Sequence, residues 1–172
     1  MALASHQADG FSGSTRLHCD LCDAINIMVF SSSATGTALW HIFKADDAPK
    51  LRAYINNVFS CTLDDPIHCQ RYYLGPSHLN ELKSSYDIVP FTIHQGVGEA
   101  VFIPAGCPHQ VCYWPAPLQF HFLLMYRSAT KLTVSRSRQI SCPLKLSQLV
   151  WRLPANFDKK ISETHGKTMF SS

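Results

Sequence analysis

A histidine and an aspartate two positions apart are candidates for part of a metal site near the start of this chain. His18 and Asp20 stand in the stretch Leu-His-Cys-Asp-Leu-Cys-Asp. On an extended strand, residues two apart point to the same face, so this imidazole and carboxylate would converge. They are two members of the 2-His-1-carboxylate triad that holds non-haem Fe(II). The third ligand must come from a distant strand, and His109, which follows a Pro-Ala-Gly-Cys-Pro turn, is the candidate.

Four blocks of the sequence, taken in order, resemble one known family. The blocks are LHCDLCDAINIMVF, ALWHIFKADDAPKLRAYI, DPIH and GEAVFIPAGCPHQV, and they span roughly residues 15–112. They are similar to the JmjC domain of histone lysine demethylases. The greatest similarity is to the plant branch that acts on histone H3 lysine 9, the increased-in-bonsai-methylation proteins. A lone His-x-Asp is a weak signal, whereas four ordered blocks that include both ligand strands are specific.

The resemblance implies an enzyme, its cofactor and its location. His18, Asp20 and His109 would be the catalytic Fe(II) ligands, and 2-oxoglutarate would be the co-substrate. The implied reaction is hydroxylation of an N-methyl group on lysine, coupled to decarboxylation of 2-oxoglutarate to succinate, followed by loss of formaldehyde. The implied partners are the methylated lysine of the histone H3 tail and chromatin-associated proteins. The implied location is the nucleus.

The far carboxylate of 2-oxoglutarate needs a cation or several hydroxyl and amide donors. Many JmjC proteins use a lysine on the strand that aligns with residues 38–43, and here Ala38 takes its place, as in the lysine-9 branch. The nearest candidates for this pocket are Thr15, Asn26, Trp40 and His41, although each could instead have a purely structural role in the core or in a strand. Aromatic side chains would suit a methylammonium group. Those available are Tyr72, Tyr73 and Trp114.

Three further residues near the His-x-Asp pair allow other interpretations. Cys19 and Cys22 form a Cys-x-x-Cys, a spacing that suits zinc or redox chemistry. No second Cys-x-x-Cys follows, which disfavours a zinc site, and Cys19 should point away from the two ligands on a strand. Asp23 is expected to support the site or the fold from outside the ligand set.

Length and composition favour one globular, intracellular domain. The chain has 172 residues, of which 46% are hydrophobic, so it can bury a sizeable core. Its seven cysteines are an odd number, and no signal peptide precedes them, which favours reduced thiols over a disulfide scaffold. No apolar run reaches 18 residues, so no membrane partner is expected.

The expected fold is mainly β, a double-stranded β-helix of the jelly-roll or cupin-like JmjC type, with flanking helices. Strands are predicted at residues 24–30, 37–43, 72–74, 90–94 and 100–104, and helices at 45–59 and 76–86. Residues 1–14 are predicted to be a flexible leader, 15–126 the catalytic core, and 127–172 a basic, divergent segment with a closing helix. Since only 17 residues precede His18, the barrel is expected to lack part of its usual wall.

The C-terminal third is the most basic part of the sequence. Residues 100–157 contain no Asp or Glu, while six Lys and Arg residues fall there: Arg127, Lys131, Arg136, Arg138, Lys145 and Arg152. A basic segment suits an anionic partner or a solvated face. No nucleic-acid-binding motif accompanies it, so no direct sequence-specific binding is expected. Residues 128–141 are predicted to be less ordered than the core.

Three functions are consistent with these observations. The leading one is a Fe(II)/2-oxoglutarate dioxygenase that demethylates histone H3 lysine 9. The first alternative is a truncated JmjC-fold protein with weak or no activity that acts as a chromatin interaction module. The second is a metal-binding cupin-type protein without demethylase activity. The intact triad favours the first, and the shortened barrel favours the alternatives.

Overall fold

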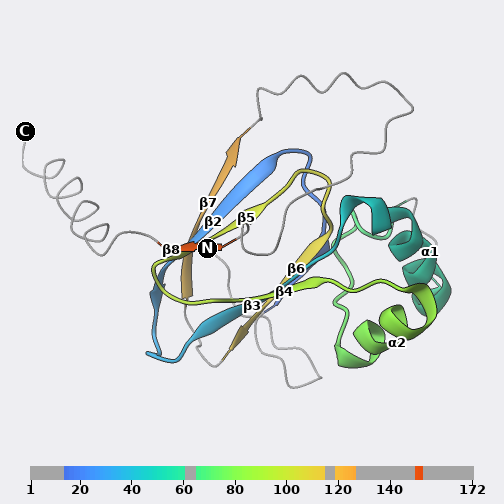
Figure 1. The fold of residues 1–172 in the computed structure, drawn as a ribbon, viewed down its shortest axis with the longest axis horizontal. Coiled ribbons are helices and arrows are strands. Elements are labelled where there is room, and N and C mark those ends of the chain that lie inside the picture. The colour runs from blue at the N-terminus through green and yellow to red at the C-terminus, as the bar shows by residue number, and fades with distance from the viewer. Residues whose placement is uncertain (1–13, 61–64, 115–118, 127–149, 153–172) are drawn as a thin grey trace, which may run out of the picture.

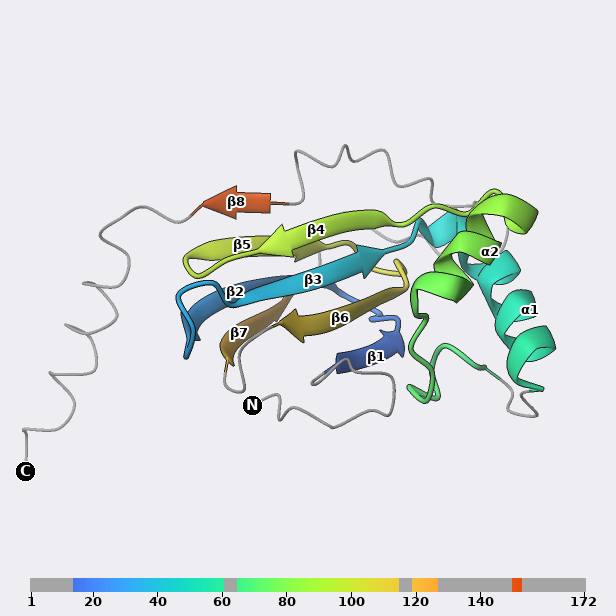
Figure 2. The same cartoon turned by 90° about the horizontal axis from the view of Figure 1, so that it is seen from below.

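The computed structural model describes residues 14–60, 65–114, 119–126 and 150–152. These residues form two four-stranded antiparallel sheets that face each other, with helices at one end (Figures 1 and 2). The first sheet has the order β1 (Ser14–His18), β6 (His109–Trp114), β3 (Thr37–Ile42) and β4 (Phe91–Gln95). The second has the order β7 (Gln119–Tyr126), β2 (Asp23–Ser31), β5 (Glu99–Ile103) and β8 (Val150–Arg152). The predicted jelly-roll class is confirmed.

The main core fills the space between the two sheets. Side chains alternate between the faces of a strand, and every second residue of β3 (Ala38, Trp40, Ile42) is buried in this core. Met28 of β2 and Val101 of β5 meet them from the other sheet. Both sheets therefore have an inner, mostly apolar face, and a polar side chain on that face lies in the space where a ligand would bind.

The helices are close to their predicted positions. A short 3-10 turn, η1 (Ala45–Asp47), leads into α1 (Ala48–Phe59), and α2 (Pro76–Tyr86) follows later. Each helix has proline in its first turn, where a missing N–H has no cost. Each ends at a left-handed residue, Ser60 with φ 49° and Asp87 with φ 54°.

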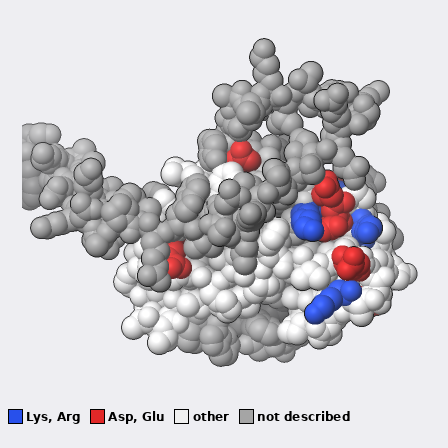
Figure 3. Space-filling model, in the orientation of Figure 1, with Lys and Arg blue, Asp and Glu red and all other residues white. Residues whose placement is uncertain are grey.

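The helices lie at one end of the first sheet and form a second core there (Figure 2). Its fully buried members include Leu17 of β1, Leu51, Tyr54 and Ile55 of α1, and Leu82 of α2. Lys and Arg side chains visible in Figure 3 gather at this helical end, next to Asp and Glu. One pair there is Arg52 and Asp65, whose Nε and Oδ2 atoms lie 2.9 Å apart.

Two predicted elements are wrong. Residues 72–74 form no strand, because the side chain of Gln110 takes both the N–H and the C=O of Leu74, at 2.9 and 2.8 Å. The predicted closing helix is also wrong over Val150–Arg152, which form β8 and pair with β5. The β-branched and aromatic residues Val150 and Trp151 suit an added edge strand.

Other expectations fall outside the described residues. They include the leader, apart from Ser14, which begins β1, and the segment 128–141. Among the helices that the structure describes, none is long and apolar enough to cross a membrane.

Candidate metal centre

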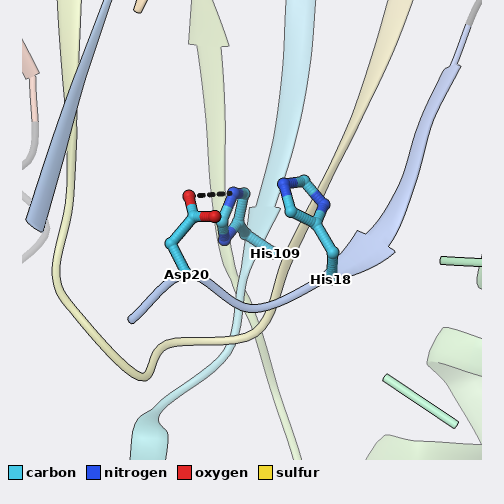
Figure 4. Close-up of side chains that lie close together, drawn as sticks. All are labelled: His18, Asp20 and His109. Carbon is cyan, nitrogen blue, oxygen red and sulfur yellow. Dashed lines mark ion pairs between the residues drawn. The ribbon is translucent and has the colours of Figure 1, made fainter. Parts of the chain in front are cut away.

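His18, Asp20 and His109 meet at the end of the first sheet nearest the helices. His18 is the last residue of β1 and His109 the first of β6, and they are register partners. Asp20 lies two residues beyond the end of β1, in irregular backbone. One ligand atom from each residue lies within 4.8 Å of the others. Figure 4 shows the three side chains turned toward one another, as the sequence predicts. One of these pairs, Nε2 of His109 and Oδ2 of Asp20, is 3.8 Å apart, inside the roughly 3–4 Å expected around a bound ion.

A bulge in β1 turns the ligand strand toward the inside. The register shifts between Thr15 and His18, so that Thr15 pairs with Val111 and His18 with His109. Val111 belongs to the core between the sheets, and Thr15 and His18 therefore both face that space although they are three residues apart. Leu17 turns to the other side, where it is fully buried beneath the helices.

Both histidines present the same ring nitrogen to the centre. Nδ1 of His18 lies 2.8 Å from the carbonyl oxygen of Arg16, and Nδ1 of His109 lies 3.0 Å from that of Cys107. A carbonyl only accepts, so each Nδ1 carries the proton and each Nε2 keeps its lone pair. Backbone hydrogen bonds of this kind orient histidine ligands in metal sites.

Electrostatics favour neutral imidazole at His109. Its side chain is almost fully buried, and burial, with the neighbouring His18 ring, lowers the pKa of His109 to about 4. The two rings are 4.2 Å apart between centroids. Nε2 of His109 lies 3.8 Å from Oδ2 of Asp20, which is too long for a hydrogen bond and leaves both atoms available to a shared cation.

The turn before β6 is attached to the loop after β1 by two hydrogen bonds. The N–H of Ala105 donates to Oδ1 of Asp23 at 2.8 Å, and the N–H of Gly106 donates to the carbonyl of Asp20 at 2.9 Å. Gly106 has φ +79°, a conformation that favours glycine. Asp23, expected to act from outside the ligand set, thus ties the loop that carries Asp20 to the turn that leads into His109.

Three of the four predicted co-substrate residues face the space between the sheets. Thr15 contacts the hydroxyl of Tyr113 at 3.2 Å, and Asn26 bonds Gln95. Trp40 stacks beside His109 with centroids 6.2 Å apart. Trp40 therefore forms one wall of the candidate site.

His41 does not belong with them, and its predicted place in the pocket is wrong. It lies on the opposite face of β3 from Trp40, where its Nδ1 is 3.3 Å from Nε2 of Gln110. Tyr72 likewise stacks on Phe59 of α1, with ring centroids 4.6 Å apart. His41 faces away from the pocket because alternate residues of a strand point to opposite faces. Tyr72 contacts α1 because residues 72–74 do not form the predicted strand.

Sequence reasoning missed Gln95, Tyr113 and His121, which also face the inner space. Gln95 is fully buried and bonded to Trp40 and Asn26. His121 is 2.8 Å from the side chain of Asn26, and its ring lies 5.1 Å from that of Tyr113. The alternation of polar residues at positions 119 and 121 was the available signal.

The alternative metal site at Cys19 and Cys22 gains no further ligand. Within the described residues, the group with three or more potential ligand side chains is His18, Asp20 and His109, which includes neither cysteine. Cys19 instead packs against the core beneath the helices. As predicted, it points away from the metal centre.

Comparison with known proteins places this geometry in a family. The sequence profile of the JmjC domain, described as a hydroxylase, matches residues 11–114. Lysine-specific demethylase JMJ29 of Arabidopsis thaliana is 47% identical over 87 residues, which cover 45% of this chain and 10% of that protein. Lysine-specific demethylase JMJ26 of the same plant is 33% identical over 153 residues, with 56% and 18% covered.

The similarity extends to animals. Lysine-specific demethylase 3 of Drosophila melanogaster is 36% identical over 139 residues, which cover 58% of this chain and 16% of that protein. The chain thus spans less than a fifth of the length of these relatives. A solved structure of a mutant Bacillus subtilis oxalate decarboxylase OxdC overlaps 92% of this chain and 27% of its own, at 10% identity and a TM-score of 0.33, too low to support a conclusion.

Proposed function

We propose that this chain, which belongs to the JmjC domain family of hydroxylases, is a Fe(II)- and 2-oxoglutarate-dependent demethylase of histone lysine that acts in the nucleus. The observation that carries the proposal is the donor set of the metal centre. The Nε2 atoms of two imidazoles and one carboxylate lie within 4.8 Å of one another, and the Nδ1 atom of each imidazole faces a backbone carbonyl. This is the donor chemistry that non-haem Fe(II) requires.

The three ligands would make different contributions to binding the ion. His18 and His109 would each supply an Nε2 lone pair, and Asp20 would supply the negative charge that partly neutralises a divalent cation. Bound Fe(II), with 2-oxoglutarate and O₂, supplies the oxidation that hydroxylates an N-methyl group while the co-substrate becomes succinate and CO₂. The hydroxymethyl group would then leave as formaldehyde as its C–N bond breaks, and its hydroxyl proton would pass to the lysine nitrogen.

The inner face of the sheets would bind and shield the co-substrate. Thr15 and Asn26 offer hydroxyl and amide donors, and Trp40 covers one side of His109. Trp40 is 2% exposed, so it would exclude water from that side of the site. The substrate would be a methylated lysine of the histone H3 tail, with lysine 9 the expected position.

One observation favours the alternative, a weakly active or inactive JmjC-fold protein that acts as a chromatin interaction module. Leu123 and Met125 of β7 pair with the inward-facing Asn26 and Ala24 of β2. They are nevertheless 52% and 53% exposed. The inner space is therefore open to solvent beside β7, where water would weaken the electrostatic interactions of a reaction.

A two-stage assay tests the proposal on the purified chain. The first stage measures anaerobic binding of Fe(II), with Mn(II) as a redox-inert probe. The second measures succinate and formaldehyde, and the mass of H3 peptides methylated at lysine 4, 9, 27 or 36. Demethylation at lysine 9 that requires both iron and 2-oxoglutarate supports the enzyme. Metal binding without turnover on any peptide would support the alternative.

A further inference from the structure

The strand β7 has a free outer edge. It pairs with β2 on one side and stands at the end of the second sheet (Figure 1). Among the described residues, only β2 supplies backbone partners to β7. Every second residue of such an edge strand points its backbone N–H and C=O away from the sheet. An extended segment that lies beside β7 would therefore find unpaired donors and acceptors along it.

The other three edge strands are less suited to accept a further strand. Short length and charged side chains protect the edges of natural sheets. β1 presents the exposed Arg16, and β8 has only three residues. The exposed residues of β4 are the polar Thr92 and His94. In contrast, β7 has eight residues, and none of them is Asp, Glu, Lys, Arg, Pro or Gly.

Three consecutive apolar residues of β7 are exposed, and they lie on both of its faces. Leu123 and Met125 face the inner space and are 52% and 53% exposed, while Leu124 faces the outside, opposite Ile25 of β2, and is 55% exposed. No other run of three large apolar side chains is exposed in the described part of the chain. A long, neutral, apolar edge of this kind is a site where another strand adds to the sheet.

The three exposed residues are complementary to themselves in one register. We consider two copies of β7 that run antiparallel about a twofold axis at Leu124. Leu124 then lies opposite Leu124 of the second copy, and Leu123 lies opposite Met125 of the second copy. Residues directly opposite each other have Cβ atoms about 4.5–5.5 Å apart. Each exposed apolar side chain would therefore contact another one, as a twofold interface requires.

The charge of the region favours a second copy over a charged peptide. Because β7 contains no charged side chain, two copies meet without repulsion between like charges. A basic peptide, such as a histone tail, would find no countercharge there, since residues 100–157 contain no Asp or Glu. An acidic peptide would find none on β7 itself. Burial of either peptide's charges against the leucines would be unfavourable.

We propose that two copies of this chain associate by antiparallel pairing of residues 122–126 of β7, about a twofold axis at Leu124. The second sheets of the two copies would join into one continuous sheet, with four described strands from each. The paired segment is short, so the contact should bury less than the roughly 1,200–2,000 Å² of a standard stable interface. We therefore expect a weak dimer, with a Kd in the micromolar range.

Association would also close the open side of the inner space. Leu123 and Met125 leave that space exposed to solvent beside β7, and the same two residues of the second copy would lie against them on the inner side. The consequence for catalysis rests on the proposed function, and it is that turnover per chain rises with the fraction of dimer. The pairing itself does not depend on the proposed function.

Sedimentation velocity and hydrogen exchange test the pairing on the unmodified chain. We expect monomer to convert to dimer as the chain concentration rises through the micromolar range. In the same samples, amides of residues 119–126 should exchange more slowly at high concentration, because pairing adds backbone hydrogen bonds. Amides of residues 91–95 in β4, which is also an edge strand, should be unaffected.

Charge substitutions at Leu124 test the register. Leu124→Lys and Leu124→Glu should each raise the dimer Kd by more than about tenfold, because like charges would lie directly opposite each other. An equimolar mixture of the two variants should associate again, as a heterodimer. Val89→Lys is the matched control, since Val89 is 53% exposed but lies between α2 and β4, and it should dimerise normally. Far-ultraviolet circular dichroism confirms that each variant is folded.

Several outcomes would overturn the inference. They are a monomer at every concentration, association that continues to larger species, a dimer whose β7 amides are not protected, and protection of β7 only when an H3 peptide is added. A dimer that persists in both Leu124 variants, or a mixture of the two that stays monomeric, would also overturn it.

The outcomes also distinguish this inference from the proposed function. Demethylation by a chain that stays monomeric would remove the inference and leave the enzyme intact. A dimer with protected β7 amides but without turnover at any concentration would support the inference and count against the enzyme.

Discussion

The carboxylate of Asp23 accepts a hydrogen bond from the backbone N–H of Ala105 across 2.8 Å, although 82 positions separate the two residues. Asp23 begins β2, and Ala105 lies in the turn between β5 and β6. The bond joins the segment that carries Asp20 to the segment that delivers His109. A residue outside the ligand set thus helps to set the distance between two of the ligands.

Asp23→Ala should weaken metal binding without removing a ligand. Loss of the acceptor leaves the Ala105 N–H unpaired and frees the turn, so we expect the Mn(II) Kd to rise roughly 10–100-fold. The free energy of unfolding should fall by about 1–3 kcal/mol. Asp47→Ala is the matched control, because Asp47 makes no side-chain capping bond. An unchanged Kd in Asp23→Ala would show that the turn is held without it.

Asp20→Ala should cost more metal affinity than Asp23→Ala does. It removes the one anionic donor of the proposed triad and leaves only the two imidazoles, so binding should fall by more than the roughly 100-fold upper end expected for a supporting residue. Iron-dependent turnover should disappear. Cys19→Ser provides the comparison, since Cys19 packs beneath the helices. A normal Mn(II) titration in Asp20→Ala would exclude Asp20 as a ligand.

Gln95→Leu should destabilise the fold and loosen Trp40. The substitution leaves the buried Trp40 N–H without its acceptor, at a cost of roughly 1–3 kcal/mol, and it removes the amide that donates to two backbone carbonyls. Trp40→Phe removes that N–H, so the double variant should be more stable than the sum of the single effects. Chemical denaturation of the four proteins gives this coupling energy directly. Strict additivity would mean that the two side chains act independently.

Asp65 should make the stability of the helical end depend on acid pH. Burial raises the pKa of Asp65, but hydrogen bonds from the backbone of His68 and Ile67 and from Arg52 outweigh it and lower the pKa overall. The folded state therefore binds this proton less tightly than the unfolded state does. The stabilisation is present above the unfolded pKa of about 3.9 and is lost as pH falls through the lower folded value.

Asp65→Asn should remove that acid dependence and cost about 1–3 kcal/mol at neutral pH, where the charged hydrogen bonds are intact. Thermal unfolding between pH 3 and pH 7 measures both effects, and Asp46→Asn serves as the control. A wild-type Tm that falls no faster toward pH 3 than that of Asp65→Asn would contradict this account.

Much of the fold and the candidate ligands could be predicted from local sequence patterns, because those patterns report short-range physics. The prolines in the first turn of each helix and the apolar stripe of α1 placed both helices within a few residues. The His-x-Asp pair, together with the family blocks, predicted that His18, Asp20 and His109 would lie together, as they do. Alternation along β3 already separated Trp40 from His41, and applying it would have avoided that error.

Only the tertiary structure decided which distant groups share hydrogen bonds. Leu74 forms no strand because a side chain from β6 takes its backbone groups. Asp23 meets Ala105, and Gln95 connects Trp40 to Asn26. A buried polar group must find a partner wherever the chain brings one, and that choice depends on the packing of the two sheets rather than on neighbours in sequence.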